Sequence, residues 1–405
     1  MIGRTRRRAA VAPGPFLREF LRHEAAGAVV LLAATAIALA VANSPLAAAY
    51  GRLLHAEIGL PFGPPGLAQP LKQWVDDALM TLFFFVVGLE IKREVVVGEL
   101  SSRRRALLPV LAALGGMAAP AAIYLAFNGG GGAAAGWGVP VATDIAFSLG
   151  VLALLGPRVP AGLKVFLAAL AIADDIGAIL VIAVFYTSGL HWDWIGFALV
   201  PLAALLAANR RRVESPLVYL AAGVTLWFAV LSSGIHATVA GVIAAFTVPA
   251  AAREPHGVAP LQRFERAVHP ISTFLVLPAF ALANAGIALS GVRLGSPVAL
   301  GIILGLVAGK LCGVLLAVWL AVRAGVAEVP AGVGWRHLSG AAALAGIGFT
   351  MSLFIANLAF APGPESAEAT SAIFAASIVA GCLGYVLLRF WAPPAGADGA
   401  SQRKG

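Results

Sequence analysis

The sequence predicts an all-α polytopic membrane protein. Of its 405 residues, 60% are hydrophobic and only 12% are charged, and the mean hydropathy is +0.91. A soluble fold of this length could not hide so much apolar surface from water. The apolar stretches run continuously over roughly 15 to 25 residues instead of alternating with period two. Of the two structures that satisfy every backbone polar group in lipid, helices and closed barrels, this pattern indicates helices.

Twelve apolar segments can be recognised, six in each half of the chain. The first six cover about residues 24–43, 73–91, 106–127, 134–156, 162–187 and 194–208. The other six cover about residues 216–232, 235–251, 268–290, 297–320, 337–361 and 368–391. We therefore expect one membrane domain over residues 1–405, with a cytoplasmic arm at 1–23, a transmembrane bundle at 24–391 and a cytoplasmic tail at 392–405.

The basic residues fall almost entirely on one side when both termini are placed in the cytoplasm. Only Arg52, Lys72 and Arg293 fall on the other side. This asymmetry favours an even number of spans, and it explains the net charge of +9 as a topology signal, so we expect lipid and no nucleic acid as partners. The cytoplasmic set comprises Lys92, Arg93, Arg103, Arg104, Arg105, Arg158, Lys164, Arg210, Arg211, Arg212, Arg253, Arg263, Arg266, Arg323, Arg336 and Arg389.

The longest outer connection, about residues 44–72, is rich in proline and glycine. This composition predicts turns or a short hairpin, which could serve as an interaction surface. The two cysteines, Cys312 and Cys382, both lie within apolar runs, and their spacing indicates neither a zinc site nor a disulfide framework.

Two adjacent carboxylates, Asp174 and Asp175, lie in the middle of the fifth segment. An ionisable side chain at mid-bilayer costs at least about 2.5 to 3.5 kcal/mol, so it is a functional hypothesis by default. Neighbours on a helix point about 100° apart, so we expect one acid to face a water-filled cavity and the other to pair across the bundle. The alternative is a structural polar pair, although two bare acids need more compensation than that role requires.

Polar breaks interrupt the fourth and the eleventh segments. Proline removes a helical hydrogen bond, and the freed carbonyls can coordinate a cation where they line a cavity. Paired interruptions in corresponding halves point to an inverted-repeat transporter, with two discontinuous helices that cross at mid-membrane. The alternatives are a simple proline kink with a capping acid, and glycines that serve packing alone. The interrupting residues are Pro140, Thr143 and Asp144 in the fourth segment, and Gly346, Gly348 and Thr350 in the eleventh.

Lys310 lies near the middle of the tenth segment. Glycines at four-residue spacing surround it, which allows another helix to approach closely. We expect the lysine to form a salt bridge with one acid of the pair, or to offset the negative ends of broken half-helices. The alternative is a lysine that snorkels to the membrane surface, but Lys310 lies too far from either interface to reach water easily. The glycines are Gly301, Gly305, Gly309 and Gly313.

Other charged groups lie at the ends of segments. Asp76 and Asp77 open the second segment. Its cytoplasmic end holds Glu90, Lys92, Arg93 and Glu94, for which a solvated cluster is the alternative to a functional role. His236, and His269 together with Glu265, could titrate near neutral pH, although lone histidines are more often structural.

Taken together, these motifs resemble the NhaA-type bacterial sodium/proton antiporters over the full length. No single motif is specific, but their order and their placement on the predicted segments are. The resemblance is carried by DALM at 77–80, FFFVVGLEIKRE at 83–94, ATDIAF at 142–147, ADDIGA at 173–178, SGIHAT at 233–238, NAG at 284–286, GK at 309–310 and GIGFTMS at 346–352.

The resemblance implies a role for each matching position. Asp175 would be the main ligand of sodium and a proton carrier, and Asp174 would exchange a bridge to Lys310 for a proton. Thr143 and Asp144 would lie where the broken helices cross. Glu90, Glu94, Glu265, His269 and His236 would belong to the pH-sensing and funnel residues, and Asp77 would lie on the path to the outside.

The resemblance also implies the activity and the assembly. Transport would be electrogenic, with more protons than sodium ions exchanged, with lithium as a substitute for sodium, and with regulation by pH. The chain would need no cofactor, would not be an enzyme, and would reside in the bacterial inner membrane as a homodimer formed partly through residues 44–72. Arg266 stands beside Glu265 where well-known members have a histidine, so we expect a shifted pH response.

Two rival functions can be weighed against antiport. A sodium-coupled symporter of an organic solute would also use broken helices, but the spans offer few polar groups for a solute beyond the acids. An intramembrane aspartyl protease needs two acids on facing helices, whereas Asp174 and Asp175 are adjacent on one helix.

Overall fold

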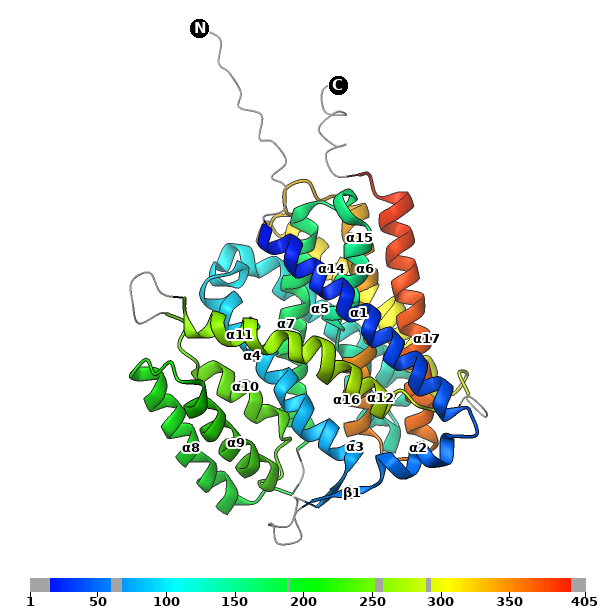
Figure 1. Cartoon of the computed structure of the whole chain (residues 1–405). Coiled ribbons are helices and arrows are strands. Elements are labelled where there is room, and N and C mark those ends of the chain that lie inside the picture. Colours follow the sequence, from blue (N-terminus) through cyan, green and yellow to red (C-terminus); the bar gives the residue numbers. More distant parts are fainter. Residues whose placement is uncertain (1–14, 60–67, 188, 252–257, 289–292, 395–405) are drawn as a thin grey trace, which may run out of the picture.

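The computed structural model describes residues 15–59, 68–187, 189–251, 258–288 and 293–394, and nearly all of this chain is helical (Figure 1). Residues 1–14 of the predicted arm, Arg253 and residues 395–405 of the predicted tail lie outside this described part. Within it, the predicted all-α polytopic membrane fold is confirmed.

The elements follow the predicted segments in order. The first half contains α1 (Pro15–Ala42), α2 (Ala47–Leu54), β1 (Glu57–Ile58), β2 (Gln69–Pro70), α3 (Leu71–Trp74), η1 (Val75–Leu79), α4 (Met80–Val96), η2 (Glu99–Ser101), α5 (Arg103–Asn128), η3 (Gly132–Val141), α6 (Ile145–Leu154), η4 (Gly156–Arg158), α7 (Ala161–Phe185) and α8 (Trp192–Arg210). The second half contains α9 (Pro216–Ser232), α10 (Thr238–Thr247), α11 (Pro260–Ile271), η5 (Ser272–Val276), α12 (Leu277–Asn284), α13 (Pro297–Leu304), η6 (Gly305–Gly309), α14 (Lys310–Arg323), α15 (Trp335–Leu344), α16 (Phe349–Ala359), α17 (Pro364–Val386) and η7 (Leu387–Trp391).

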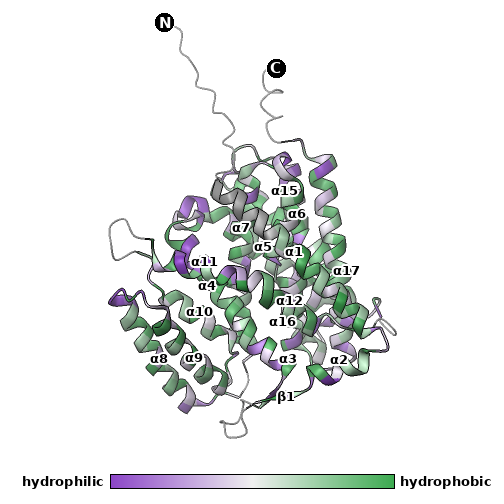
Figure 2. Cartoon of the chain, viewed as in Figure 1, coloured by the Kyte–Doolittle hydropathy of each residue, from purple (hydrophilic) through white to green (hydrophobic). Residues whose placement is uncertain are grey.

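Eight helical stretches of the described chain are long and apolar enough to cross a membrane, or nine if the bent pair of α15 and α16 counts as one span. Helices α9 and α10 are apolar but shorter, with 17 and 10 residues. The count of twelve crossings and the inverted-repeat relation stay predictions. Figure 2 shows that hydrophobic residues make up most of the long helices, and many large apolar side chains, such as Leu180, Val184 and Leu217, are exposed, as expected where lipid takes the place of water.

The outer connection contains the predicted hairpin. Strands β1 and β2 pair antiparallel, with Glu57 opposite Pro70 and Ile58 opposite Gln69. Residues 60–67, which join them, lie outside the described part. The role of this hairpin in a dimer stays a prediction.

Most of the buried apolar side chains of the described chain belong to two clusters. The larger cluster, which we call the large bundle, draws on α1, α5 to α7 and α12 to α17. The smaller one, the small bundle, draws on α8, α9 and α10 with Leu261 of α11. Helix α4 contributes to both, through Met80 and Phe84 to the large bundle and through Leu89 to the small one. In Figure 1, α8, α9 and α10 stand together beside the remaining helices.

Another helix approaches the glycine stripe of the tenth segment closely, as predicted, and that helix is α5. A Cβ at Gly309 would press on the backbone of Pro120, and one at Gly313 would overlap the carbonyl oxygen of Gly115. These glycines allow α13, η6 and α14 to approach the backbone of α5, which sets the depth at which Lys310 lies.

We expect Gly313→Ala to lower the free energy of unfolding by about 1 to 3 kcal/mol, because the added methyl group meets backbone atoms that cannot move aside. Gly196 is a helical glycine of α8 with no atom within 4 Å of the position a Cβ would take. Gly196→Ala is therefore the matched control, expected to stabilise the protein by about 0.5 to 1 kcal/mol. Thermal unfolding of both variants in the same detergent would decide, and equal midpoints would contradict the close contact.

Candidate functional site

The two interrupted segments meet at their breaks. The chain is extended at Ala142 and Asp144, between η3 and α6. Helices α15 and α16 are bent by 45° where residues 345–348 separate them. The Asp144 backbone N–H donates to the Ile347 carbonyl at 2.7 Å, and the Thr143 hydroxyl lies 2.8 Å from the Ala345 carbonyl oxygen. The breaks therefore contact each other through their own freed polar groups.

Small residues make this contact possible. A Cβ at Gly346 would overlap the carbonyl oxygen of Leu306, and one at Gly348 would overlap the hydroxyl of Ser352. Pro140 packs against Gly305 on the other side of the break. These three residues were predicted as parts of the broken backbone, and they lie where the two segments cross the tenth one.

Asp144 caps two helices at once. Its Oδ1 accepts from the Phe147 backbone N–H at 3.0 Å, in the first turn of α6. Its Oδ2 accepts from the Thr350 backbone N–H at 3.0 Å and from the Thr350 hydroxyl at 2.5 Å, in the first turn of α16. One carboxylate thus faces the N-terminal ends of both half-helices, where the helix dipole favours a negative charge.

Lys310, Asp174 and Thr143 form a buried polar group at the same crossing, each with 0% of its surface exposed. The Lys310 ammonium is paired with Asp174 Oδ2 and donates to the Thr143 hydroxyl at 3.0 Å. The single Thr143 proton can be given to Asp174 Oδ2, 2.5 Å away, or to the Ala345 carbonyl at the end of α15. Lys310 therefore pairs with one acid of the predicted two, and acts on the C-terminal end of a half-helix through Thr143.

Asp175 faces a different environment, as the offset between neighbours on a helix predicts. It is 1% exposed and lines a small cavity of about 40 Å³ together with Asp144, Glu90, His269 and Thr350. No lysine or arginine of the described chain forms a salt bridge with it. One carboxylate oxygen on each acid, Oδ1 of Asp174 and Oδ1 of Asp175, has no hydrogen-bond partner among the described residues.

Charged residues from α4 and α11 gather at one end of this cavity. Glu90 Oε1 lies 3.5 Å from Nε2 of His269, and both line the cavity. Arg93 pairs with Glu265 and, at 3.2 Å, with Glu94. Glu90 is buried, so the interpretation of this cluster as wholly solvated is wrong for that residue.

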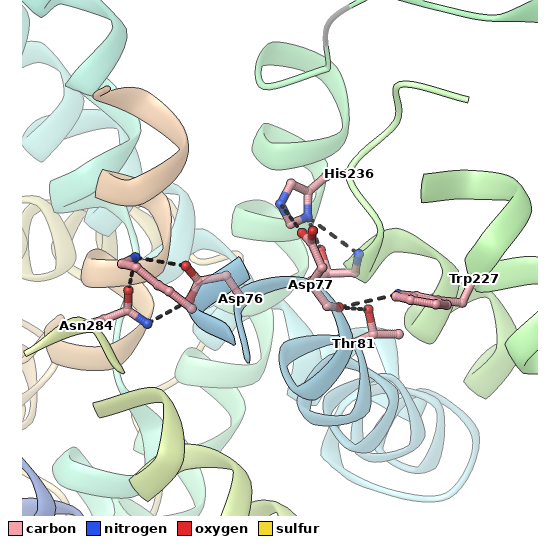
Figure 3. Close-up of polar contacts among 8 residues, drawn as sticks. Asp76, Asp77, Thr81, Trp227, His236 and Asn284 are labelled. Atoms are coloured by element: carbon pink, nitrogen blue, oxygen red, sulfur yellow. Dashed lines mark hydrogen bonds and ion pairs between the residues drawn. The ribbon is translucent and has the colours of Figure 1, made fainter. Parts of the chain in front are cut away.

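A second, larger cavity of about 530 Å³ lies at the other end of α4. Asp77 and His236 line it, with the imidazole Nε2 3.9 Å from the carboxylate Oδ1 (Figure 3). His236 was grouped with Glu90 and His269 in the sequence, but the turn between α9 and α10 holds it in this second cavity. The two cavities share no lining residue within the described chain.

Sequence reasoning assigned no partner to Asp76, because Lys72 was noted only for its side of the membrane and Asn284 only within the NAG motif. The Asp76 carboxylate accepts hydrogen bonds from Lys72 and from the Asn284 amide. Asn357 in turn donates to Asn284. The available signal was a polar residue in the outer half of the predicted ninth segment and another in the outer half of the eleventh.

Comparison with known proteins gives one consistent family. The sequence profile described as Na+/H+ antiporter 1 matches residues 18–388. The Na(+)/H(+) antiporter NhaA of Mesorhizobium japonicum is 50% identical over 393 residues, which cover 95% of this chain and 96% of that protein. The Na(+)/H(+) antiporter NhaA 1 of Novosphingobium aromaticivorans is 50% identical over 401 residues, covering 96% and 93%. The NhaA protein of Shewanella frigidimarina is 48% identical over 381 residues, covering 93% and 95%.

The double cap at Asp144 predicts an unusually large loss on substitution. Asp144→Asn keeps the shape but presents an amide N–H₂ group to at least one donor, which leaves a buried N–H unpaired. We expect it to lower the free energy of unfolding by about 2 kcal/mol or more, against about 1 kcal/mol for the loss of an ordinary cap. Ser296, whose hydroxyl accepts from the Ala299 N–H at 3.2 Å and caps α13 alone, supplies the control in Ser296→Ala. Thermal unfolding of the two variants measures the difference, and an equal loss would show that Asp144 serves one helix only.

Proposed function

The chain belongs to the Na+/H+ antiporter 1 family, and on this premise we propose that it exports sodium ions, or lithium ions in their place, in exchange for protons across the bacterial inner membrane. The observation that carries the proposal is the split of two adjacent acids. Asp174 is paired with Lys310, while Asp175 faces a cavity without a lysine or arginine partner in the described chain.

Competition for Asp175 couples the two ions. A carboxylate withdrawn from water strongly disfavours an unpaired negative charge, so Asp175 needs either a proton or a cation. A proton and a sodium ion neutralise the same charge and exclude each other. The free Oδ1 atoms of Asp175 and Asp174 support a sodium site between the two acids, because carboxylate oxygens are the ligands that hard cations prefer.

Asp174 supplies the second proton of the cycle. When Asp174 takes up a proton it gives up its bridge to Lys310, and when it loses that proton the bridge forms again. In the sodium-loaded state Asp175 holds the cation and Asp174 holds the lysine. In the proton-loaded state both acids are protonated. One sodium ion is then exchanged for two protons, so transport moves net charge.

Access to Asp175 must alternate between the two sides. The small cavity connects Asp175 to Glu90 and His269, on the side that we assign to the cytoplasm from the distribution of basic residues. The large cavity stops at Asp77 and His236, on the outer side. Rocking of one group of helices against another would open the outer path and close the inner one.

The remaining roles follow from these positions. Glu90, Glu94, Glu265 and His269 form the cytoplasmic funnel that adjusts activity to pH, and Arg266 shifts that response. Both termini lie in the cytoplasm, no cofactor is needed, and a homodimer forms in the lipid bilayer through residues 44–72. The relatives are antiporters by name and lend no support to a symporter of an organic solute.

Asp175→Asn is the direct test of the exchange site. The amide keeps the size of the side chain but can take up neither a proton nor the charge of a cation at that position. We expect sodium-dependent pH changes in everted membrane vesicles to fall to the level of vesicles without the protein, at equal protein content. Asp193→Asn, at an exposed position in the first turn of α8, is the control and should leave exchange unchanged.

The same vesicles test the choice of cation. Sodium and lithium should both support exchange, and potassium should not. Unchanged exchange in Asp175→Asn, or potassium exchange at the rate of sodium, would contradict the proposed site.

A further inference from the structure

The short segment η1 stands between the two bundles at the outer end of α4. Its adjacent acids face opposite ways (Figure 3). Asp77 faces the small bundle, where it meets His236, and its backbone carbonyl accepts from the Trp227 indole at 3.4 Å. Asp76 faces the large bundle, where its Oδ1 accepts from the Asn284 amide of α12 at 2.6 Å. Each acid is therefore tied to a different helix bundle.

Four side chains on the Asp76 side form one network, which we call the outer clasp: Lys72, Asp76, Asn284 and Asn357. Lys72 donates to Asp76 Oδ2 at 3.0 Å and also to Asn284 Oδ1. Asn357 of α16 donates to the same Asn284 oxygen at 2.7 Å. The clasp therefore joins three segments that are distant in the sequence: α3 with η1, then α12, then α16.

A layer of aromatic side chains lies beneath the clasp, on α12, on α16 and on α4, which directly follows η1. Phe84 of α4, Phe280 of α12 and Phe354 of α16 are each at most 1% exposed. The Phe354 ring centre lies 5.4 Å from that of Phe84 and 6.2 Å from that of Phe280. Phe354 also lines the larger cavity, which contains Asp77 and His236. This cavity shares no lining residue of the described chain with the cavity of Asp175.

Helix geometry links the two layers. Phe280 precedes Asn284 by four residues, and the Asn284 amide donates to the Phe280 carbonyl at 3.1 Å. Phe354 precedes Asn357 by three residues. Residues three or four apart lie on one face of a helix. Each asparagine is therefore on the same face as the phenylalanine one turn away, and its bonds in the clasp fix the position of that face. Separating α16 from α12 would break the clasp and part the aromatic layer together.

The exposure of the clasp suits a contact that opens. The side chains of Lys72 and Asp76 keep 32% and 17% of their surface exposed, at the rim of a cavity of about 530 Å³. Water in that cavity can take over their hydrogen bonds when the clasp separates. The Lys310 and Asp174 side chains, in contrast, are 0% exposed in this structure, so their bond is shielded from water.

We propose that the outer clasp holds the path from the outside to Asp175 closed, and that Lys72, Asp76, Asn284 and Asn357 are positioning residues that set the balance between inner and outer access. The proposal rests on the exchange function given above. Weakening the clasp favours outer access, and the apparent affinity for an ion rises in proportion to the fraction of protein that is open to it.

Asn357→Ala and Lys72→Met test this by comparing the sodium concentration that gives half-maximal exchange on each side, in vesicles of the two orientations. We expect the outer value to fall by about threefold to tenfold, and the inner value to change less than twofold, since the inner-access state dominates at the start. Asn128→Ala is the control, because Asn128 also makes a bond between helices, to the Pro297 carbonyl at 2.9 Å, but takes no part in the clasp. The exchange of charges in Lys72→Asp with Asp76→Lys should recover much of the original balance.

A labelling experiment separates this proposal from the exchange function itself. Ile182 is 1% exposed and lies seven residues beyond Asp175 on α7, about two turns toward the outer end. With Cys312 and Cys382 replaced by serine, Ile182→Cys should react with a membrane-impermeant thiol reagent from outside several times faster when Asn357→Ala is added. Unchanged labelling, or sodium affinities that change equally on both sides, would overturn the clasp even where exchange persists. Absence of exchange with faster labelling would support the clasp and count against the exchange function.

Discussion

The buried pair of Lys310 and Asp174 is the interaction on which the rest of the structure depends. Two charges withdrawn from water lose several kcal/mol of hydration each, and their attraction offsets this only with close geometry and further hydrogen bonds. Thr143 supplies such a bond from one broken segment and links the pair to the Ala345 carbonyl of the other. The glycines of η6 bring Lys310 to the required depth against Pro120 of α5. Much of the unusual backbone near mid-membrane therefore serves one ion pair.

The two helix breaks place charged side chains near mid-membrane, because the helix ends that they expose must be neutralised. Two interrupted helices present N-terminal and C-terminal ends inside an apolar bundle, each with unpaired backbone groups. Asp144 satisfies the two N-terminal ends, and Lys310 with Thr143 serves a C-terminal end. Because Asp144 caps the helix ends and Asp174 pairs with Lys310, Asp175 is the acid of this site that can bind an exchangeable cation or proton. The same logic recurs at the outer end of α4, where Asp76 is held by Lys72 and Asp77 faces a cavity.

Sequence reasoning found the site because charges and breaks in apolar segments are rare. The acid pair, Lys310, both interruptions and the glycine stripe could all be located without coordinates. The 100° offset of Asp174 and Asp175 required two environments, but it could not say which acid meets Lys310, since that depends on how α7 is rotated in the bundle. Sequence reasoning noted Asn284 only within the NAG motif and did not identify Asn357, because the two asparagines are 73 residues apart and only the fold brings them together. The burial of Glu90 likewise follows from the packing of α4 against α11.

Competition of sodium and protons for the same buried carboxylates can be measured on the purified protein. Protons released when sodium is added are counted in weakly buffered detergent solution, with sodium binding followed in parallel by calorimetry. We expect more than one proton to be released for each sodium ion bound, the same with lithium, and none with potassium. Sodium binding without any release of protons would contradict it.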